Sequence, residues 1–274
     1  MNPGDIPTGM RLRGLAGWNQ TEQDWQRFLQ MNPEGCFAAE LDGAVCGTVT
    51  TLAYEKHFGW IGMVLVDPAQ RGQGIGTRLL LQGMNYLQAA GIETLKLDAT
   101  PMGHPLYLQL GFEDEYQIER WEGVSHGGSG AGLKMTLEQF DRVCRWDREV
   151  FGADRSRLLT CLWREGARYS AVLCSGSEIS GYIFGRAGSR AHYLGPWVAE
   201  TGSGAAELLF REFLARVSGE QVFVDVCCEN PEARGIVEAA GFRHQRVLTR
   251  MFHGPNRHPG SPRLVCSIAG PELG

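Results

Sequence analysis

The sequence has no apolar run long enough to span a membrane, so we expect no membrane contact. Residues 1–5 contain neither the basic region nor the apolar core of a secretory signal, and we expect a cytoplasmic location. The eight cysteines include no Cys-x-x-Cys pair, and Cys227 and Cys228 are adjacent. This pattern favours reduced thiols over a disulfide framework or a zinc site, and we expect no metal.

A surplus of basic charge is also absent. The formal net charge of −5 argues against a nucleic-acid binder and favours a cationic or neutral substrate. The 43% of hydrophobic and 21% of charged residues are typical of a globular protein. A chain of 274 residues can bury a large core, and two domains are the natural expectation.

The most informative segment is residues 71–76, Arg-Gly-Gln-Gly-Ile-Gly. It follows the strand-like residues 60–66 and opens an apolar-periodic segment that begins at Ile75. A strand, a glycine-rich turn and a helix N-terminus form a phosphate-binding arrangement. Glycine lets the backbone approach a ligand, and the unpaired N–H groups and the positive end of the helix dipole face an anion. Arg71 adds a positive charge at the rim.

Two other phosphate-binding motifs fit less well. A P-loop has a Lys-Ser/Thr pair after its last glycine, whereas Thr77 and Arg78 follow Gly76. A dinucleotide fingerprint spaces its glycines G-x-G-x-x-G, whereas Gly72, Gly74 and Gly76 alternate here. A tight turn that requires glycine only for its dihedral angles is the remaining alternative.

The pattern Arg-x-x-Gly-x-Gly after this strand resembles the acetyl-CoA pyrophosphate loop of the GNAT superfamily of N-acyltransferases. Residues 106–112, Leu-Tyr-Leu-Gln-Leu-Gly-Phe, are similar to the family's Leu-Tyr-x-x-x-Gly-Phe segment, and Tyr107 lies 31 residues after Gly76. Both segments have the family's order and spacing. The resemblance implies that acetyl-CoA is the cofactor and that an uncharged amine attacks its thioester, with coenzyme A leaving as a thiol.

An internal repeat predicts that this unit is duplicated. Adding 130 to a residue number in the first half finds its counterpart in the second: Gly72 gives Gly202, Gly74 gives Gly204, Pro101 gives Pro231 and Gly111 gives Gly241. Residues 126–132 are rich in glycine and serine, as flexible linkers are. We therefore expect a GNAT-like domain in residues 1–125, a linker in 126–132 and a second GNAT-like domain in 133–274.

The expected fold class is α/β (α+β), with a mixed, mostly antiparallel sheet flanked by helices in each domain. The elements expected in the first half are a hairpin at 36–41 and 44–51, strands at 60–66, 94–99 and 116–121, and helices at 75–90 and 106–110. Those of the second half are a hairpin at 170–174 and 179–184, strands at 193–198 and 221–227, and helices at 205–217 and 231–240.

The resemblance implies which residues hold acetyl-CoA. The glycine turn would bind the pyrophosphate, and the preceding strand would present its backbone to the pantetheine arm and the thioester carbonyl. Gly62 could mark a bulge that opens the sheet there, and Thr100 stands where many family members carry Asn. The expected cofactor-binding residues are Met63, Val64, Leu65, Val66, Arg71, Gly72, Gln73, Gly74, Ile75, Gly76, Thr77 and Thr100.

Tyr107 is the candidate catalytic acid, because a phenol is neutral at physiological pH and can protonate a departing sulfur. A packing role for its ring is the alternative interpretation. The sequence does not identify the general base. The candidates are Glu55, His57, Asp98, His104 and a chain of water molecules.

The second half lacks the counterparts of two of these residues. Arg71 maps to Thr201, and Tyr107 maps to Val237, which has no proton to give. We therefore expect a degenerate copy that covers the acceptor pocket or mediates formation of a homodimer. The leading hypothesis is an acetyl-CoA-dependent N-acetyltransferase acting on a small-molecule amine. The alternatives are a non-catalytic acyl-CoA-binding regulator and an acetyltransferase acting on protein N-termini or lysines.

Overall fold

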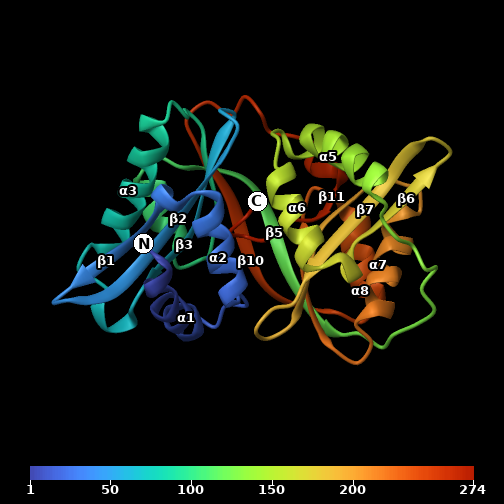
Figure 1. Ribbon diagram of the computed structural model, residues 1–274, viewed down its shortest axis with the longest axis horizontal. Helices are drawn as coiled ribbons and strands as arrows, with labels where there is room; N and C mark the ends of the chain where they lie inside the picture. Colours follow the sequence, from blue (N-terminus) through green and yellow to red (C-terminus); the bar gives the residue numbers. More distant parts are fainter. The chain divides into compact units, whose positions relative to one another are not determined.

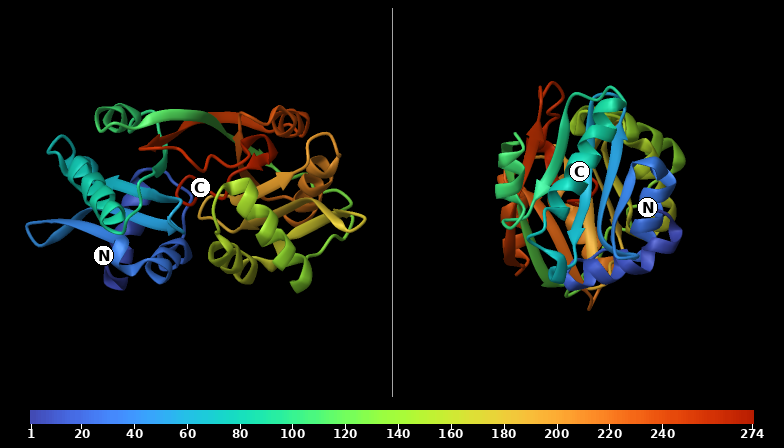
Figure 2. Two further views of the ribbon diagram at one scale, coloured as in Figure 1. Left: turned by 90° about the horizontal axis from the view of Figure 1, so that it is seen from above. Right: turned by 90° about the vertical axis from the view of Figure 1, so that its left-hand side faces the viewer.

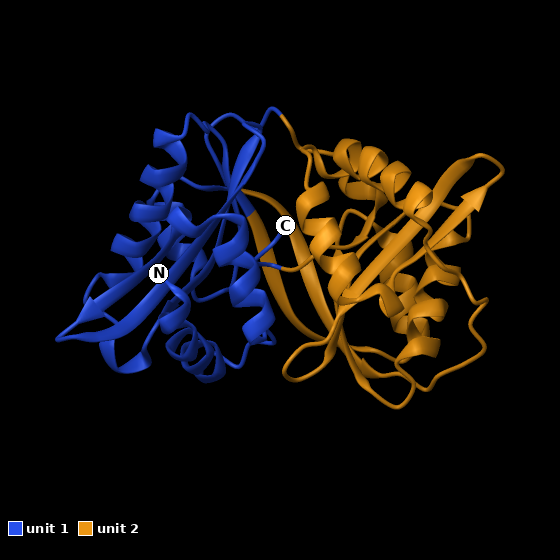
Figure 3. Ribbon diagram, viewed as in Figure 1, with its two compact units in different colours: residues 1–113, 251–257, 271–274 blue, residues 114–250, 258–270 orange.

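The computed structural model describes residues 1–274 and divides them into two compact units (Figure 3). Unit 1 comprises residues 1–113, 251–257 and 271–274, and unit 2 comprises residues 114–250 and 258–270. Each unit therefore contains chain from both halves of the sequence. The predicted domains, residues 1–125 and 133–274 joined by the linker 126–132, refer to the duplicated sequence and not to these compact units. They stay a prediction.

Unit 1 is a mixed α/β layer (Figure 1). Its strands are β1 (Cys36–Leu41), β2 (Ala44–Tyr54), β3 (Phe58–Val66) and β4 (Leu95–Ala99), with the last residues of β10 (Arg243–His253). Its helices are α1 (Ile6–Leu15), α2 (Glu22–Met31), α3 (Ile75–Ala89) and α4 (His104–Gln109).

The unit 1 sheet has the order β1-β2-β3-β4 and continues to the end of β10. The pairs β1–β2 and β2–β3 are antiparallel, and β3–β4 is parallel. Asp42 and Gly43 form the predicted hairpin turn, and both have positive φ. Figure 2 shows α3 on one side of β2 and β3, with α1 and α2 on the other.

The helices α1 and α2 were not predicted from the sequence. Pro7, Gly9 and Gly14 lower the helix propensity of α1. The tertiary structure explains one of them, because a Cβ on Gly9 would lie 2.9 Å from the Trp25 ring of α2. Gly9 therefore allows the two helices to pack closely.

Unit 2 repeats this plan. Its helices are α5 (Leu137–Phe151), α6 (Ser156–Glu165), α7 (Ala205–Arg216) and α8 (Pro231–Ala239). Its strands are β5 (Glu113–Val124), β6 (Ala171–Ser175), β7 (Glu178–Arg186), β8 (His192–Ala199), β9 (Gln221–Cys227), most of β10, and β11 (Val265–Ser267). The strand order is β10-β5-β9-β11-β8-β7-β6. The predicted fold class is confirmed in both units.

One predicted strand lies elsewhere than expected. Residues 116–121 were expected to close the first domain, but they belong to β5, which pairs antiparallel with β9 of unit 2. The pairing runs from Ile118 opposite Cys227 to Val124 opposite Gln221. Its alternating side chains predict a strand but carry no information about its partner. No helix of the structure is both long and apolar enough to cross a membrane.

Candidate functional site

The glycine turn of unit 1 joins β3 to α3. Gly72 has φ of 79° and Gly74 has φ of 75°, a left-handed conformation that favours glycine. No atom lies within 4 Å of a Cβ built on either residue, so the dihedral angles and not crowding require glycine. Gly74 is also the N-cap of α3 and has no side chain that could cap the helix.

Six consecutive amides, from Gly72 to Thr77, have no hydrogen-bond acceptor in the protein. The first amide of α3 that is bonded within the chain is that of Arg78, which donates to the carbonyl of Gly74 at 3.0 Å. The amides lie at the N-terminal end of a 15-residue helix, where the helix dipole favours an anion. The turn therefore offers donors and a positive potential to a phosphate group.

Gly76 gives a separate reason to expect a phosphate group at this turn. Its φ is not in the left-handed region, and a Cβ there would lie no closer than 3.6 Å to the protein, at Val66. The fold itself would accept alanine at this position. An open surface beside the unbonded amides is the shape that a phosphate-binding turn requires.

Arg71 and Gln73 lie at the exposed rim of the turn. The Nε of Arg71 donates to the carbonyl of Val66 at 3.4 Å, and Gln73 donates to Gln70 at 2.8 Å. Both side chains thus stay close to the turn, and Arg71 keeps its positive charge beside the amides.

The strand β3 contains the expected bulge, one residue after Gly62. Thr50 is opposite Gly62 and Thr48 is opposite Leu65, so Met63 and Val64 together face one residue of β2. Met63 has φ of 51°, a strained value for a residue with a side chain. The bulge therefore changes the direction of β3 at the residues predicted to hold the pantetheine arm.

The strands β3 and β4 separate beyond the bulge. They pair only at Gly59 with Leu95 and at Trp60 with Lys96. From Met63 to Val66, β3 pairs with β2 but presents an unpaired edge towards β4. Backbone donors and acceptors on this edge can bond an extended ligand arm.

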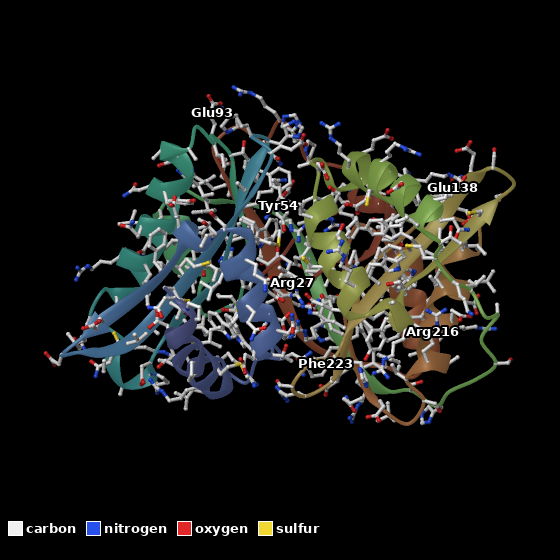
Figure 4. The ribbon with its side chains drawn as sticks, in the orientation of Figure 1. Arg27, Tyr54, Glu93, Glu138, Arg216 and Phe223 are labelled. Atoms are coloured by element: carbon white, nitrogen blue, oxygen red, sulfur yellow. The ribbon has the colours of Figure 1, made fainter.

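Gly62 has a role that the sequence did not show. A Cβ on this residue would lie 2.9 Å from the backbone oxygen of Glu272, because the C-terminal residues 271–274 pass over β3. Trp60 donates to the carbonyl of Pro271 at 3.1 Å, and Tyr54, labelled in Figure 4, donates to that of Leu273 at 2.6 Å. The glycine therefore permits a close approach of backbone.

Thr100 and Tyr107 flank the start of α4. The hydroxyl of Thr100 accepts a hydrogen bond from the amide of Gly103 at 3.3 Å, so Thr100 closes the turn before the helix. Tyr107 is half-buried, and its ring centroid lies 6.0 Å from that of Phe112. Burial raises the pKa of Tyr107 to about 12, which keeps the phenol protonated. No protein group hydrogen-bonds to its hydroxyl.

The four side chains considered as a base lie at two ends of the unit. Glu55 and His57 are in the β2–β3 turn, with 3.5 Å between Oε2 and Nδ1. This turn is at the paired end of β3, about 20 Å of extended chain from Met63. Asp98 is near the separated end of β4, and His104 opens α4.

Asp98 lies on the sheet face opposite α3. Leu95, Leu97 and Ala99 of β4 pack in the core cluster that contains Leu80 and Leu87 of α3. Because side chains alternate along a strand, Lys96 and Asp98 point to the other face. The role of Asp98 as a base stays a prediction.

Glu272 is a residue that the sequence analysis missed. Only 3% of its surface is exposed, and its Oε2 accepts a hydrogen bond from Gln20 at 2.8 Å. It contacts Gly62, which is on the same face of β3 as Trp60, since the intervening Ile61 packs in the α3 core. No local motif signals it, because the segment reaches β3 only through the tertiary fold.

The matching turn of unit 2 has a similar backbone conformation, but side chains of the protein accept hydrogen bonds from its amides. Gly202 and Gly204 have φ of 71° and 74°. The carboxylate of Glu232 accepts a hydrogen bond from the amide of Gly202 at 2.9 Å, and the hydroxyl of Ser203 accepts one from Ala205 at 3.2 Å. A carboxylate of the protein thus takes the place that an anionic ligand would occupy.

The gap between the two parallel strands of unit 2 is also filled. The strands β8 and β9 pair from His192 to Leu194, and beyond this point β11 lies between them. Ser267 of β11 donates to the carbonyl of Leu194 at 2.9 Å and accepts from the amide of Asp225 at 3.3 Å. Val237, at the position equivalent to Tyr107, is fully buried. Groups of the chain itself thus occupy both the turn and the strand gap of unit 2, and the degeneracy of the second copy stays a prediction.

Comparison with known proteins identifies the family. Residues 11–112 match the model described as the acetyltransferase (GNAT) family, and residues 143–264 match an acetyltransferase (GNAT) domain. The chain belongs to the GNAT superfamily, in its tandem two-domain form. It is an acyltransferase enzyme of this family.

One curated relative and two solved structures align with nearly the whole tandem GNAT chain. Holothin acyltransferase of Pseudoalteromonas sp. (strain SANK 73390) is 26% identical over 261 residues, which are 94% of this chain and 87% of that protein. The structure of a candidate acetyltransferase of Pyrococcus horikoshii has a TM-score of 0.85 at 22% identity, covering 100% of this chain and 94% of that one. A tandem GNAT protein from the clavulanic acid biosynthesis pathway has a TM-score of 0.64 at 16% identity, covering 92% and 94%. Both structural likenesses concern the fold alone.

Proposed function

We propose that unit 1 transfers an acetyl group from acetyl-CoA to the amine of a small molecule. The observation that carries this proposal is the row of six unbonded amides from Gly72 to Thr77 beside a bulged and unpaired strand edge. The amides would hold the pyrophosphate, with Arg71 at the rim. The edge from Met63 to Val66 would bond the pantetheine arm.

The reaction supplied by acetyl-CoA is nucleophilic displacement at a thioester. An uncharged amine adds to the carbonyl carbon, the carbon–sulfur bond breaks, and the sulfur leaves as a thiol. Backbone N–H groups near Met63 would polarise the carbonyl. The phenol of Tyr107 would donate its proton to the departing sulfur, because it is protonated and has no partner within the protein.

The amine would approach on the sheet face that carries Asp98 and Glu272. Asp98 is the base candidate best placed for the proton that the amine loses, since Glu55 and His57 lie at the other end of β3. The backbone of Glu272 passes over Gly62, and its carboxylate adds negative charge to this part of the unit, which favours a cationic amine. His104 and a water chain remain alternatives for the base.

A calorimetric titration with acetyl-CoA, and separately with coenzyme A, tests the cofactor. We expect micromolar binding at one site per chain, because the turn and the strand gap of unit 2 are filled. Two sites would contradict the assignment of unit 2, and no binding would contradict the acyl-CoA site. A screen of amines, with the released thiol measured, then tests the acceptor.

Two other functions are distinguished by the same assays. A regulator would bind acetyl-CoA but release no thiol with any amine. A protein acetyltransferase would turn over with peptide N-termini or lysines and not with small amines. The name of the relative holothin acyltransferase makes holothin the first acceptor to screen.

A further inference from the structure

Three arginines project from one face of β5 and β10 in unit 2. On β5, Arg120 is two residues from Ile118, and on β10, Arg246 and Arg250 are each two residues from Leu248. Ile118 and Leu248 pack in one buried cluster with Ile268. Because side chains alternate along strands, the three arginines surround this cluster on the same face.

The acidic group in this cluster is already neutralised. Asp225 receives two hydrogen bonds from Arg120, at 2.7 Å from Nε and 2.5 Å from Nη2, and one from the hydroxyl of Tyr193 at 2.9 Å. The Arg120–Asp225 pair is buried and bidentate, the geometry that best compensates two charges. Asp225 therefore already accepts three hydrogen bonds, and none of them comes from Arg246.

Arg246 is left without compensation. It forms no hydrogen bond or ion pair with any protein group, and its Nε is buried without a partner. The pKa of Arg246 is lowered to about 10, mainly by burial and then by the charge of Arg120. Arg190 also lowers this pKa, whereas Asp225 and Tyr193 raise it. A half-buried guanidinium in this position is destabilising unless an anion accompanies it.

The neighbouring residues include further guanidinium groups. The guanidinium carbons of Arg120 and Arg190 lie 5.4 Å and 5.7 Å from the centroid of the Phe223 ring, which is labelled in Figure 4. Arg186 lies 4.4 Å from the ring of Tyr193 and donates to the carbonyl of Ala269. A positive cluster in a chain of net charge −5 is not the result of a generally basic surface.

We propose that Arg246, with Arg120 and Arg190 beside it, forms an anion-binding site in unit 2 that takes the oxyanion group of a small molecule. The forked donors of the guanidinium match the two oxygens of a carboxylate or a phosphate. The site is built from the second half of the duplicated chain together with β5. Its existence does not depend on acetyl transfer by unit 1.

Titration of the full chain with succinate and with inorganic phosphate, at constant ionic strength and with saturating coenzyme A to fill the turn of unit 1, tests the site. We expect saturable binding of one anion, and the anion that binds more tightly assigns the site to carboxylates or to phosphates. Arg246→Gln should weaken that binding at least about tenfold. Arg243→Gln is the matched control, because Arg243 is on the same strand and exposed and the charge change is the same.

Thermal unfolding provides a second readout. Without added anion, Arg246→Gln should melt no lower than the wild type, because it removes an uncompensated cation. With coenzyme A present throughout, succinate or phosphate should raise the melting temperature of the wild type and of Arg243→Gln, but not that of Arg246→Gln. Absence of saturable binding in the wild type, or equal losses in the two variants, would overturn the proposal. If Arg246→Gln does not fold, Arg246→Lys provides the test. This variant keeps the positive charge but loses the paired N–H donors of the guanidinium, so it should bind the anion more weakly than the wild type.

Discussion

The carboxylate of Glu232 accepts a hydrogen bond from the amide of Gly202, whereas the equivalent amide of Gly72 has no acceptor in the protein. The offset of 130 residues maps Glu232 to Met102, whose thioether side chain is 74% exposed and cannot replace a carboxylate. Two turns with equivalent glycines and similar φ angles therefore differ in their hydrogen bonding. One leaves its amides without an acceptor in the protein, and the other is closed by its own chain.

Replacing Gly74 with alanine should weaken acetyl-CoA binding by about tenfold or more, because the left-handed turn would shift and misplace the amides. Gly204→Ala is the control, since Gly204 has the same conformation in unit 2. Both variants should lose roughly 1 kcal/mol of stability from backbone strain, but only Gly74→Ala should lose affinity in calorimetry. Equal affinity in the two variants would exclude the turn of unit 1 as the pyrophosphate site.

Gly76→Ala separates ligand binding from strain. Alanine fits the fold here, because the nearest protein atom to its Cβ would be 3.6 Å away. The melting temperature should stay within a degree or two of the wild type, since a compatible Gly→Ala change alters stability by about 1 kcal/mol or less. Affinity for coenzyme A should fall, because the methyl group would occupy the surface beside the amides. An unchanged affinity would place the phosphates elsewhere.

Tyr107→Phe should lower kcat by about a hundredfold while leaving the affinity for acetyl-CoA nearly unchanged, because only the proton donor is lost. Tyr86→Phe is the control, since that variant also removes one phenol in unit 1, one that donates to Asn32 at 2.8 Å. The control should lose some stability but retain its kcat. A fully active Tyr107→Phe variant would remove this phenol from the mechanism.

The pH dependence of kcat should reflect the environment of Tyr107. Burial raises the pKa of this phenol to about 12, so the acid stays protonated until about pH 11. Between pH 7 and 10, the kcat of the wild type should therefore show no decrease caused by deprotonation of Tyr107. A decline with a midpoint near 10 that disappears in Tyr107→Phe would contradict the buried setting of the phenol.

Glu232→Ala should destabilise unit 2 by about 1 kcal/mol, because the amide of Gly202 would lose a charged partner. It should not create a second coenzyme A site, since β11 would still fill the gap between β8 and β9. Chemical denaturation and the calorimetric stoichiometry measure the two effects. A stoichiometry of two per chain would show that Glu232 alone closes the second site.

Gly62→Ala should lower the free energy of unfolding by about 1–3 kcal/mol, because the new Cβ would meet the backbone oxygen of Glu272 at 2.9 Å. In a chain lacking residues 272–274 the cost should largely disappear. Gly59→Ala is the control, since its Cβ would meet Leu87 at 2.6 Å and its cost should persist in the shortened chain. Additive losses for Gly62→Ala and the truncation would contradict the contact.

Sequence reasoning was most successful where the signal is local. The turn at Asp42 and Gly43, the left-handed glycines at positions 72 and 74, and the α3 helix that follows them are set by the dihedral preferences of neighbouring residues. The bulge was predicted at Gly62 and occurs one residue later, since a bulge depends on how two strands pair and not on one residue. The roles of Tyr107 and of the cofactor-binding residues stay predictions.

The sequence by itself determined the repeated elements and the glycine turn, because hydrophobic period and turn preference act over a few residues. Its resemblance to the GNAT superfamily implied the class of chemistry. Only the tertiary structure decided which strand β5 pairs with, where Glu272 lies, and which residues close the second site. The hydrogen bond between Ser267 and Leu194 spans 73 residues, and that between Tyr54 and Leu273 spans 219. Such contacts leave no periodic signal in either segment, because each is set by the packing of the whole chain.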